Sequence, residues 1–63
     1  MKSHNKEKEI IKFLKASMVI TSSELAKEIN VSWNTAEKYL LELALDKKVE
    51  RIKKTGVNLW MLK

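Results

Sequence analysis

The 63-residue chain has no cysteine and no proline, and it contains only one glycine and one histidine. Without cysteine, neither a disulfide nor a thiolate metal site can hold the fold together. The single histidine, His4, cannot form a metal cluster alone. A domain of this size buries only about 60% of its unfolded surface. Its stability must therefore come from well-patterned apolar residues, which make up 44% of the chain.

Features that would indicate an enzyme or a membrane protein are also missing. The sequence has no Gly-rich phosphate loop and no paired-carboxylate constellation, and its acidic residues are dispersed. We therefore expect no enzyme activity, cofactor, metal or small-molecule ligand. No apolar run approaches the roughly 18 residues that span a bilayer, and the start MKSHNKEKE is too polar for a signal peptide. The expectation is a cytoplasmic protein without a membrane partner, nucleoid-associated if its source is prokaryotic.

Positive charge is concentrated at the two ends of the chain, whose net charge is +5. Residues 1–20 carry five lysines against two glutamates, and residues 46–63 carry six basic residues against two acidic ones. Residues 21–45 between them carry two lysines against four glutamates. Basic flanks around an acidic middle fit a polyanionic partner whose phosphates are contacted by the flanking elements.

The first third of the sequence predicts an amphipathic helix followed by a short strand. The helix is expected from about Asn5 to Ala16, with Asn5 as its N-cap. Lysines 8, 12 and 15 lie on its polar side, which we interpret as a solvated face. The β-prone run 18–20 is long enough for one edge strand. The apolar side of the helix carries Ile10, Phe13, Leu14 and Met18, with Ile11 at its margin.

The run LAKEINVSWNTAEKYLLEL, residues 25–43, predicts two helices joined by a tight turn. Thr21 and Glu24 have the S/T-x-x-E spacing of a capping box, so the second helix should start there and end near Ile29. Ala26 is small enough for the two helices to approach closely. Asn30 tolerates the left-handed backbone that redirects the chain.

Ser32 is expected to cap a third helix, which runs from residue 33 to residue 46 or 47. On a helical wheel this helix has an apolar core side and an opposite, outward side. The core side carries Ala36, Tyr39, Leu40 and Leu43, and the outward side carries Asn34, Lys38, Leu41 and Leu45, flanked by Glu37 and Glu42.

After Lys48 the pattern predicts two strands around a turn at Thr55–Gly56. Val49 and Ile52 cannot share one face of a regular strand. We therefore expect a β-bulge, or a strand that starts after Val49. Trp60 and Leu62 share a face and are expected to pack in the core beside the first helix.

This element order and the run LAKEINVSWNTAEKYLLELALDKKVERI resemble the winged helix-turn-helix transcription regulators, from about residue 10 to residue 62. In that pattern a hydrophobic-Ala helix, a Gly-Val-Ser turn and a Thr-led recognition helix precede a hairpin wing. Here Asn30 replaces the turn glycine, Ala36 replaces a β-branched residue, and Lys38 stands where arginine is frequent. The resemblance implies an α+β, mainly helical fold. It is a single three-helix domain with the helix-turn-helix at about 22–47 and a C-terminal β-hairpin wing at about 49–62.

The resemblance also implies double-stranded DNA binding by a small transcriptional regulator. The recognition helix would enter the major groove, and the basic wing would lie on the backbone or in the minor groove. Asn34 can pair with adenine, and Lys38 can contact guanine or a phosphate. Trp33 either packs on the preceding helix or contacts a sugar or a thymine methyl group. The other expected DNA contacts are Ser22, Ser23, Ser32, Thr35, Arg51, Lys53 and Lys54.

Leu41 and Leu45 are apolar residues on the side of the third helix that should face solvent. We expect the hairpin to fold back over them; the alternatives are a dimer contact or, for Leu41, an apolar contact to DNA. A homodimer also suits a domain too small to make many base contacts. The competing function is a winged-helix protein-interaction module in a larger complex, which the near-neutral recognition helix favours.

Overall fold

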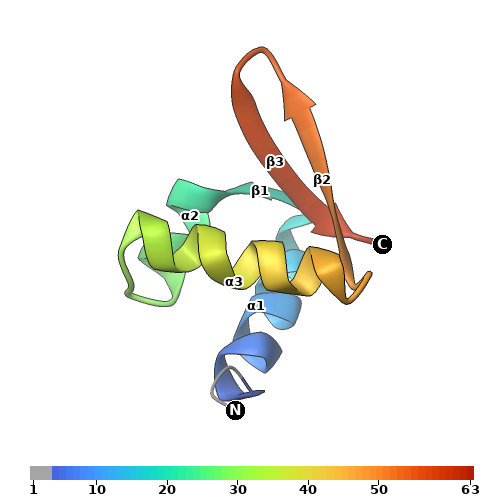
Figure 1. The fold of residues 1–63 in the computed structure, drawn as a ribbon. Helices are drawn as coiled ribbons and strands as arrows, with labels where there is room; N and C mark the ends of the chain where they lie inside the picture. The colour runs from blue at the N-terminus through green and yellow to red at the C-terminus, as the bar shows by residue number, and fades with distance from the viewer. Residues whose placement is uncertain (1–3) are drawn as a thin grey trace.

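The computed structural model describes residues 4–63, and over that range the elements follow the order expected from the sequence. The three strands form one antiparallel sheet in the order β1-β3-β2. The helices gather at one end of the hairpin, and β2 and β3 project away from them (Figure 1). The elements are α1 (His4–Ser17), β1 (Val19–Thr21), α2 (Ser22–Glu28), α3 (Trp33–Leu45), β2 (Val49–Lys54) and β3 (Val57–Leu62).

The two caps of the helix-turn-helix form as the sequence predicts. The Glu24 N–H donates to Thr21 Oγ1 at 3.1 Å, and the Thr21 N–H donates to Glu24 Oε1 at 2.9 Å, which completes the capping box of α2. Ser32 caps α3 by accepting from the Thr35 N–H at 3.2 Å. Between the helices Asn30 has a φ of 59°, so the expected left-handed turn is confirmed.

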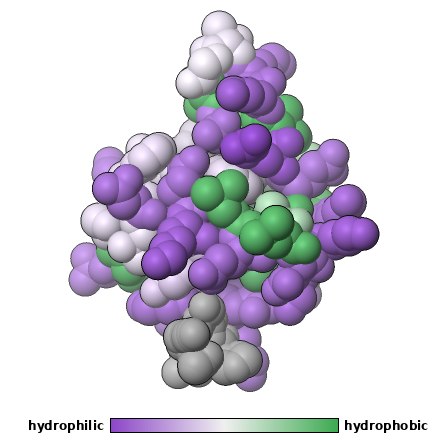
Figure 2. Space-filling model, in the orientation of Figure 1, coloured by the Kyte–Doolittle hydropathy of each residue, from purple (hydrophilic) through white to green (hydrophobic). Residues whose placement is uncertain are grey.

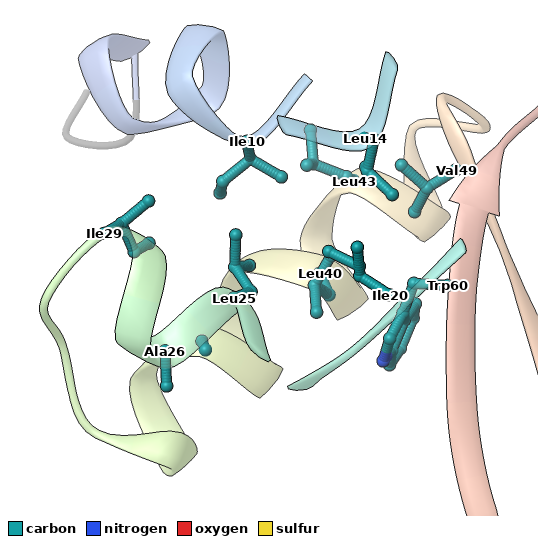
Figure 3. Close-up of a cluster of buried hydrophobic side chains, with 11 residues drawn as sticks. Ile10, Leu14, Ile20, Leu25, Ala26, Ile29, Leu40, Leu43, Val49 and Trp60 are labelled. Atoms are coloured by element: carbon teal, nitrogen blue, oxygen red, sulfur yellow. The ribbon is translucent and has the colours of Figure 1, made fainter. Parts of the chain in front are cut away.

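One apolar core joins the three helices to the inner face of the sheet (Figure 3). Leu14 of α1, Leu25 of α2, Leu40 of α3 and Trp60 of β3 each have 0% of their surface exposed. Such dense packing is what allows a small chain to fold without a disulfide or a metal. The expectation that Trp60 and Leu62 pack inward is confirmed, with Leu62 partly buried against the core.

Two expectations for the first helix are wrong. Met18 does not join the core but is 72% exposed, because the chain leaves α1 there through a left-handed turn with φ 72°. Asn5 already lies within α1, so it is not the N-cap of that helix.

At its N-terminal end α1 is joined to the α3–β2 connection, because the Lys48 ammonium donates to the Glu7 carboxylate. This hydrogen bond and the attraction of the carboxylate raise the pKa of Lys48 above its ordinary value.

The hairpin is regular, so the expected bulge is absent from it. Pairing runs without a slip from Val49↔Leu62 to Lys54↔Val57. Because successive side chains alternate, Val49 points to the core and Ile52 points to the opposite face. Both residues are apolar because each lies on a different apolar face of the sheet, and no bulge is needed to explain their spacing. The strand starts at Val49, and the two-residue turn consists of Thr55 with φ 49° and Gly56 with φ 78°, the signs of a type I′ turn.

Candidate nucleic-acid interface

The orientation of α3 is fixed by the residues that it buries. Ala36 and Leu40 have no exposed surface, and Leu43 is only 5% exposed, so this side of the helix is held against the core. The opposite side, with Asn34 and Lys38, is exposed. The expectation that these two residues project outward from one side of α3 is thus confirmed.

The wing brings two cations to the same side of the molecule. Arg51 pairs with Trp60 across the ladder and lines a hollow of about 550 Å³ together with residues of α3. Lys53 pairs with Asn58, whose side chain reaches α3. Lys54, the next residue, points to the opposite face because strand side chains alternate. We call the surface formed by Asn34, Lys38 and Leu41 of α3 and by Arg51 and Lys53 of β2 the α3–wing face.

A partly buried hydrogen-bond network connects α2, α3 and β3 beside this face. Trp60 Nε1 donates to Ser22 Oγ at 3.0 Å, and the Ser22 hydroxyl donates to the Glu37 carboxylate. Asn58 Nδ2 donates to the second oxygen of that carboxylate at 3.2 Å. Glu37 therefore links α3 to the wing strand β3. Sequence reasoning placed Glu37 only at the flank of the helix, since no local spacing relates it to residues 22, 58 and 60.

The two serines that begin α2 have different environments. Ser22 is 3% exposed, and its hydroxyl both accepts from Trp60 and donates to Glu37. Its hydroxyl is therefore engaged inside the fold, and the expected phosphate contact at this helix start stays a prediction. Ser23 is exposed, and it borders a polar groove of about 200 Å³ between the start of α2, the start of α3 and the wing turn.

Trp33 forms a wall of the same polar groove and is 50% exposed. The sequence left two interpretations, packing on the preceding helix or contact with DNA. A half-exposed Trp33 leaves aromatic surface available for the second. At the same end of α3 the Ser32 hydroxyl donates to Thr35 Oγ1 at 3.0 Å. Ser32 is exposed and Thr35 is half-buried, so both expected contact residues lie at the surface where the helix begins.

Leu41 and Leu45 form an apolar patch beside the basic residues. Leu41 is 40% exposed and Leu45 is 82% exposed, and Figure 2 shows a hydrophobic area over the C-terminal half of α3. The expectation that the hairpin covers both residues is wrong. The wing projects away from this end of the helix, which leaves a hollow lined by Leu41, Ala44, Leu45, Arg51 and Trp60.

Among the described residues there is neither a membrane-spanning helix nor a cluster of metal ligands. No helix within residues 4–63 is both long and apolar enough to cross a lipid bilayer. Among the same residues, no three His, Cys, Asp or Glu side chains come together in a cluster suited to a metal ion.

Comparison with known proteins identifies the fold. A solved structure, the Zalpha domain from Carassius auratus PKZ in complex with Z-DNA, matches the whole of this chain over its own whole length with a TM-score of 0.91 and 24% identity. No protein-family model and no curated protein sequence matches the chain. The three helices and the sheet order agree with that structure, so the chain has the winged helix-turn-helix fold expected from the sequence.

Proposed function

We propose that the chain binds double-stranded DNA through the α3–wing face. The observation that carries this proposal is the uncovered outward side of α3, with Asn34 and Lys38. On the same side of the helix, Leu41 shares a hollow with Arg51 of the wing. A face that combines an amide with several cations suits base edges and phosphates. The net charge of +5 favours a polyanion. The solved structure with the same fold is itself a complex with Z-DNA.

The finer part of the proposal assigns roles to individual side chains. Asn34 contacts a base edge, while Lys38, Arg51 and Lys53 contact phosphates. Ser23, Ser32 and Thr35 add hydroxyl contacts at the start of the two helices, and Trp33 stacks on a sugar or a base. The biological role that fits a small sequence-preferring binder is transcriptional regulation, in the cytoplasm or on the nucleoid.

The proposal also names the form of the duplex. A right-handed duplex has a major groove about 12 Å wide, which admits a helix such as α3, and this is the geometry that we propose for sequence reading. The Z-DNA complex of the similar chain makes a left-handed duplex the second geometry to measure.

The test is a titration of the chain against two duplexes of equal length. One is right-handed, and the other is a methylated CG repeat held in the left-handed form, with circular dichroism as the check on handedness. Each titration is repeated at two salt concentrations. We expect affinity that falls steeply with salt on at least one form. Affinity that is equally weak for both forms and insensitive to salt would overturn the proposal.

A second function is favoured by one specific observation. Leu41 and Leu45 are exposed and lie next to Lys38 and Arg51, an apolar patch with a charged rim of the kind found at protein interfaces. A protein-interaction module would use this patch and would not bind duplex DNA. The chain would then show no salt-dependent affinity for either duplex, and substituting both leucines with threonine should abolish association with the protein partner.

A further inference from the structure

The side of the sheet that faces away from the helices is mostly apolar. The register of the two ladders defines which side chains share that side, because paired residues of an antiparallel ladder point the same way. We call this surface the outer sheet face. It consists of Val19 and Thr21 of β1, Glu50, Ile52 and Lys54 of β2, and Val57, Leu59 and Met61 of β3.

No described element covers the outer sheet face. Ile20, Val49 and Trp60, which point the other way, are at most 2% exposed and meet the helices. Val19 and Val57 are 40% and 47% exposed. Ile52, Leu59 and Met61 are half-buried, but none of these apolar residues packs against the core. An antiparallel sheet with one solvated face ordinarily carries polar residues on it. This pattern is therefore that of a surface which meets a partner.

Met18, the residue before β1, is a further exposed apolar residue next to the sheet. It precedes Val19, is 72% exposed, and has a φ of 72°, a backbone conformation in which glycine is favoured over methionine. A large apolar side chain that is both strained and exposed is costly to stability in the isolated chain.

The charges on β2 are self-complementary, which suits a second copy of the chain as the partner. Glu50 and Lys54 lie on either side of Ile52 on the outer sheet face. A two-fold axis that passes near Ile52 places Glu50 of one copy opposite Lys54 of the other, and this occurs twice in the dimer. An isologous interface requires such a self-complementary surface.

The other two charges of β2 disfavour a different dimer, in which this edge strand pairs with its own copy. Antiparallel pairing about Ile52 would again match Glu50 with Lys54, but it would also set Arg51 against Lys53 of the other copy on the inner side of the extended sheet. Like charges directly opposite each other are destabilising, and edge lysines are a known device against such pairing. Packing of the two sheet faces keeps the Glu50–Lys54 pairs without these like-charge contacts.

We propose that the chain forms a homodimer by packing two outer sheet faces together, with Glu50 of each copy paired to Lys54 of the other. The α3–wing face lies on the opposite side of the sheet and stays open. The proposal does not depend on DNA binding. It places the dimer contact away from Leu41 and Leu45, the residues for which the sequence first suggested one.

The test is a charge swap measured by sedimentation velocity of the full chain over a range of protein concentrations. Glu50→Lys and Lys54→Glu alone should each weaken self-association by roughly tenfold, because each creates two like-charge contacts. The double variant restores complementarity and should associate as the unaltered chain does. An equimolar mixture of the two single variants should also associate, since each then meets its complement.

Leu41→Thr serves as the matched control, because it removes an exposed apolar side chain from the other surface. It should leave self-association unchanged. A chain that stays monomeric up to millimolar concentration overturns the proposal. So does a dimer that is lost in Leu41→Thr but kept in Glu50→Lys, or a double variant and a mixture that fail to restore association. Circular dichroism of each variant establishes that it is folded.

Discussion

The two adjacent lysines of the wing offer a sharp test of the α3–wing face. Lys53 shares a side of the sheet with Asn58, which is bonded to α3, whereas Lys54 points to the opposite side. Lys53→Ala and Lys54→Ala remove the same charge one residue apart. If Lys53 contacts a phosphate, its removal should lower the slope of log K against log salt by about 0.9 for a right-handed duplex. The affinity lost should then shrink by about threefold between 50 and 200 mM salt.

Lys54→Ala is expected to keep the slope of the unaltered chain. The assay is a fluorescence anisotropy titration of a labelled duplex at four salt concentrations, with the protein kept below the concentration at which it self-associates. Equal slope changes in the two variants would show that the duplex senses only the overall charge of the wing. That result would refute the assignment of Lys53 to a defined contact face.

Three further predictions concern stability, each measured by urea or thermal unfolding. Ser22→Ala leaves the Trp60 N–H without its acceptor and should cost about 1–3 kcal/mol; unchanged stability would mean that the Ser22–Trp60 bond contributes nothing. In Thr55→Asn, asparagine is better suited than threonine to the left-handed position before Gly56, so the free energy of unfolding should rise by up to about 1 kcal/mol; a lower unfolding midpoint would contradict this. Met18→Gly should stabilise the chain by about 1 kcal/mol through the relief of its left-handed backbone; a loss of stability would show that Met18 contributes packing that outweighs the strain.

The parts of the fold that the sequence predicted depend on local spacing. The capping box of Thr21 and Glu24, the Ser32 cap and the left-handed Asn30 each involve residues at most three positions apart. The outward side of α3 followed from helical periodicity alone, because the buried residue Leu40 fixes the rotation of the whole helix. Local chemistry therefore determined which side chains are offered to a partner.

The parts that the sequence did not predict depend on contacts between distant segments. Glu37 receives hydrogen bonds from residues 15 and 21 positions away, which no periodicity could relate to it. The exposure of Leu45 depends on the direction in which the wing leaves the helices. The expected bulge came from assigning Val49 and Ile52 to one face, whereas the regular register puts them on two. The face on which a strand residue lies is therefore decided by the pairing across the sheet, and the apolar pattern along one strand does not fix it.

The regular alternation of β2 gives this small domain two separate surfaces. Arg51 and Lys53 point toward the side of α3, while Glu50, Ile52 and Lys54 point away from it. A shift of one residue in the register would exchange the two sets, so the turn at residues 55 and 56 that fixes the register is important for both surfaces. Because the surfaces lie on opposite sides of one sheet, a charge change on one need not alter the other. Duplex affinity should thus follow Lys53 and self-association should follow Glu50, which makes the two proposals independent in experiment.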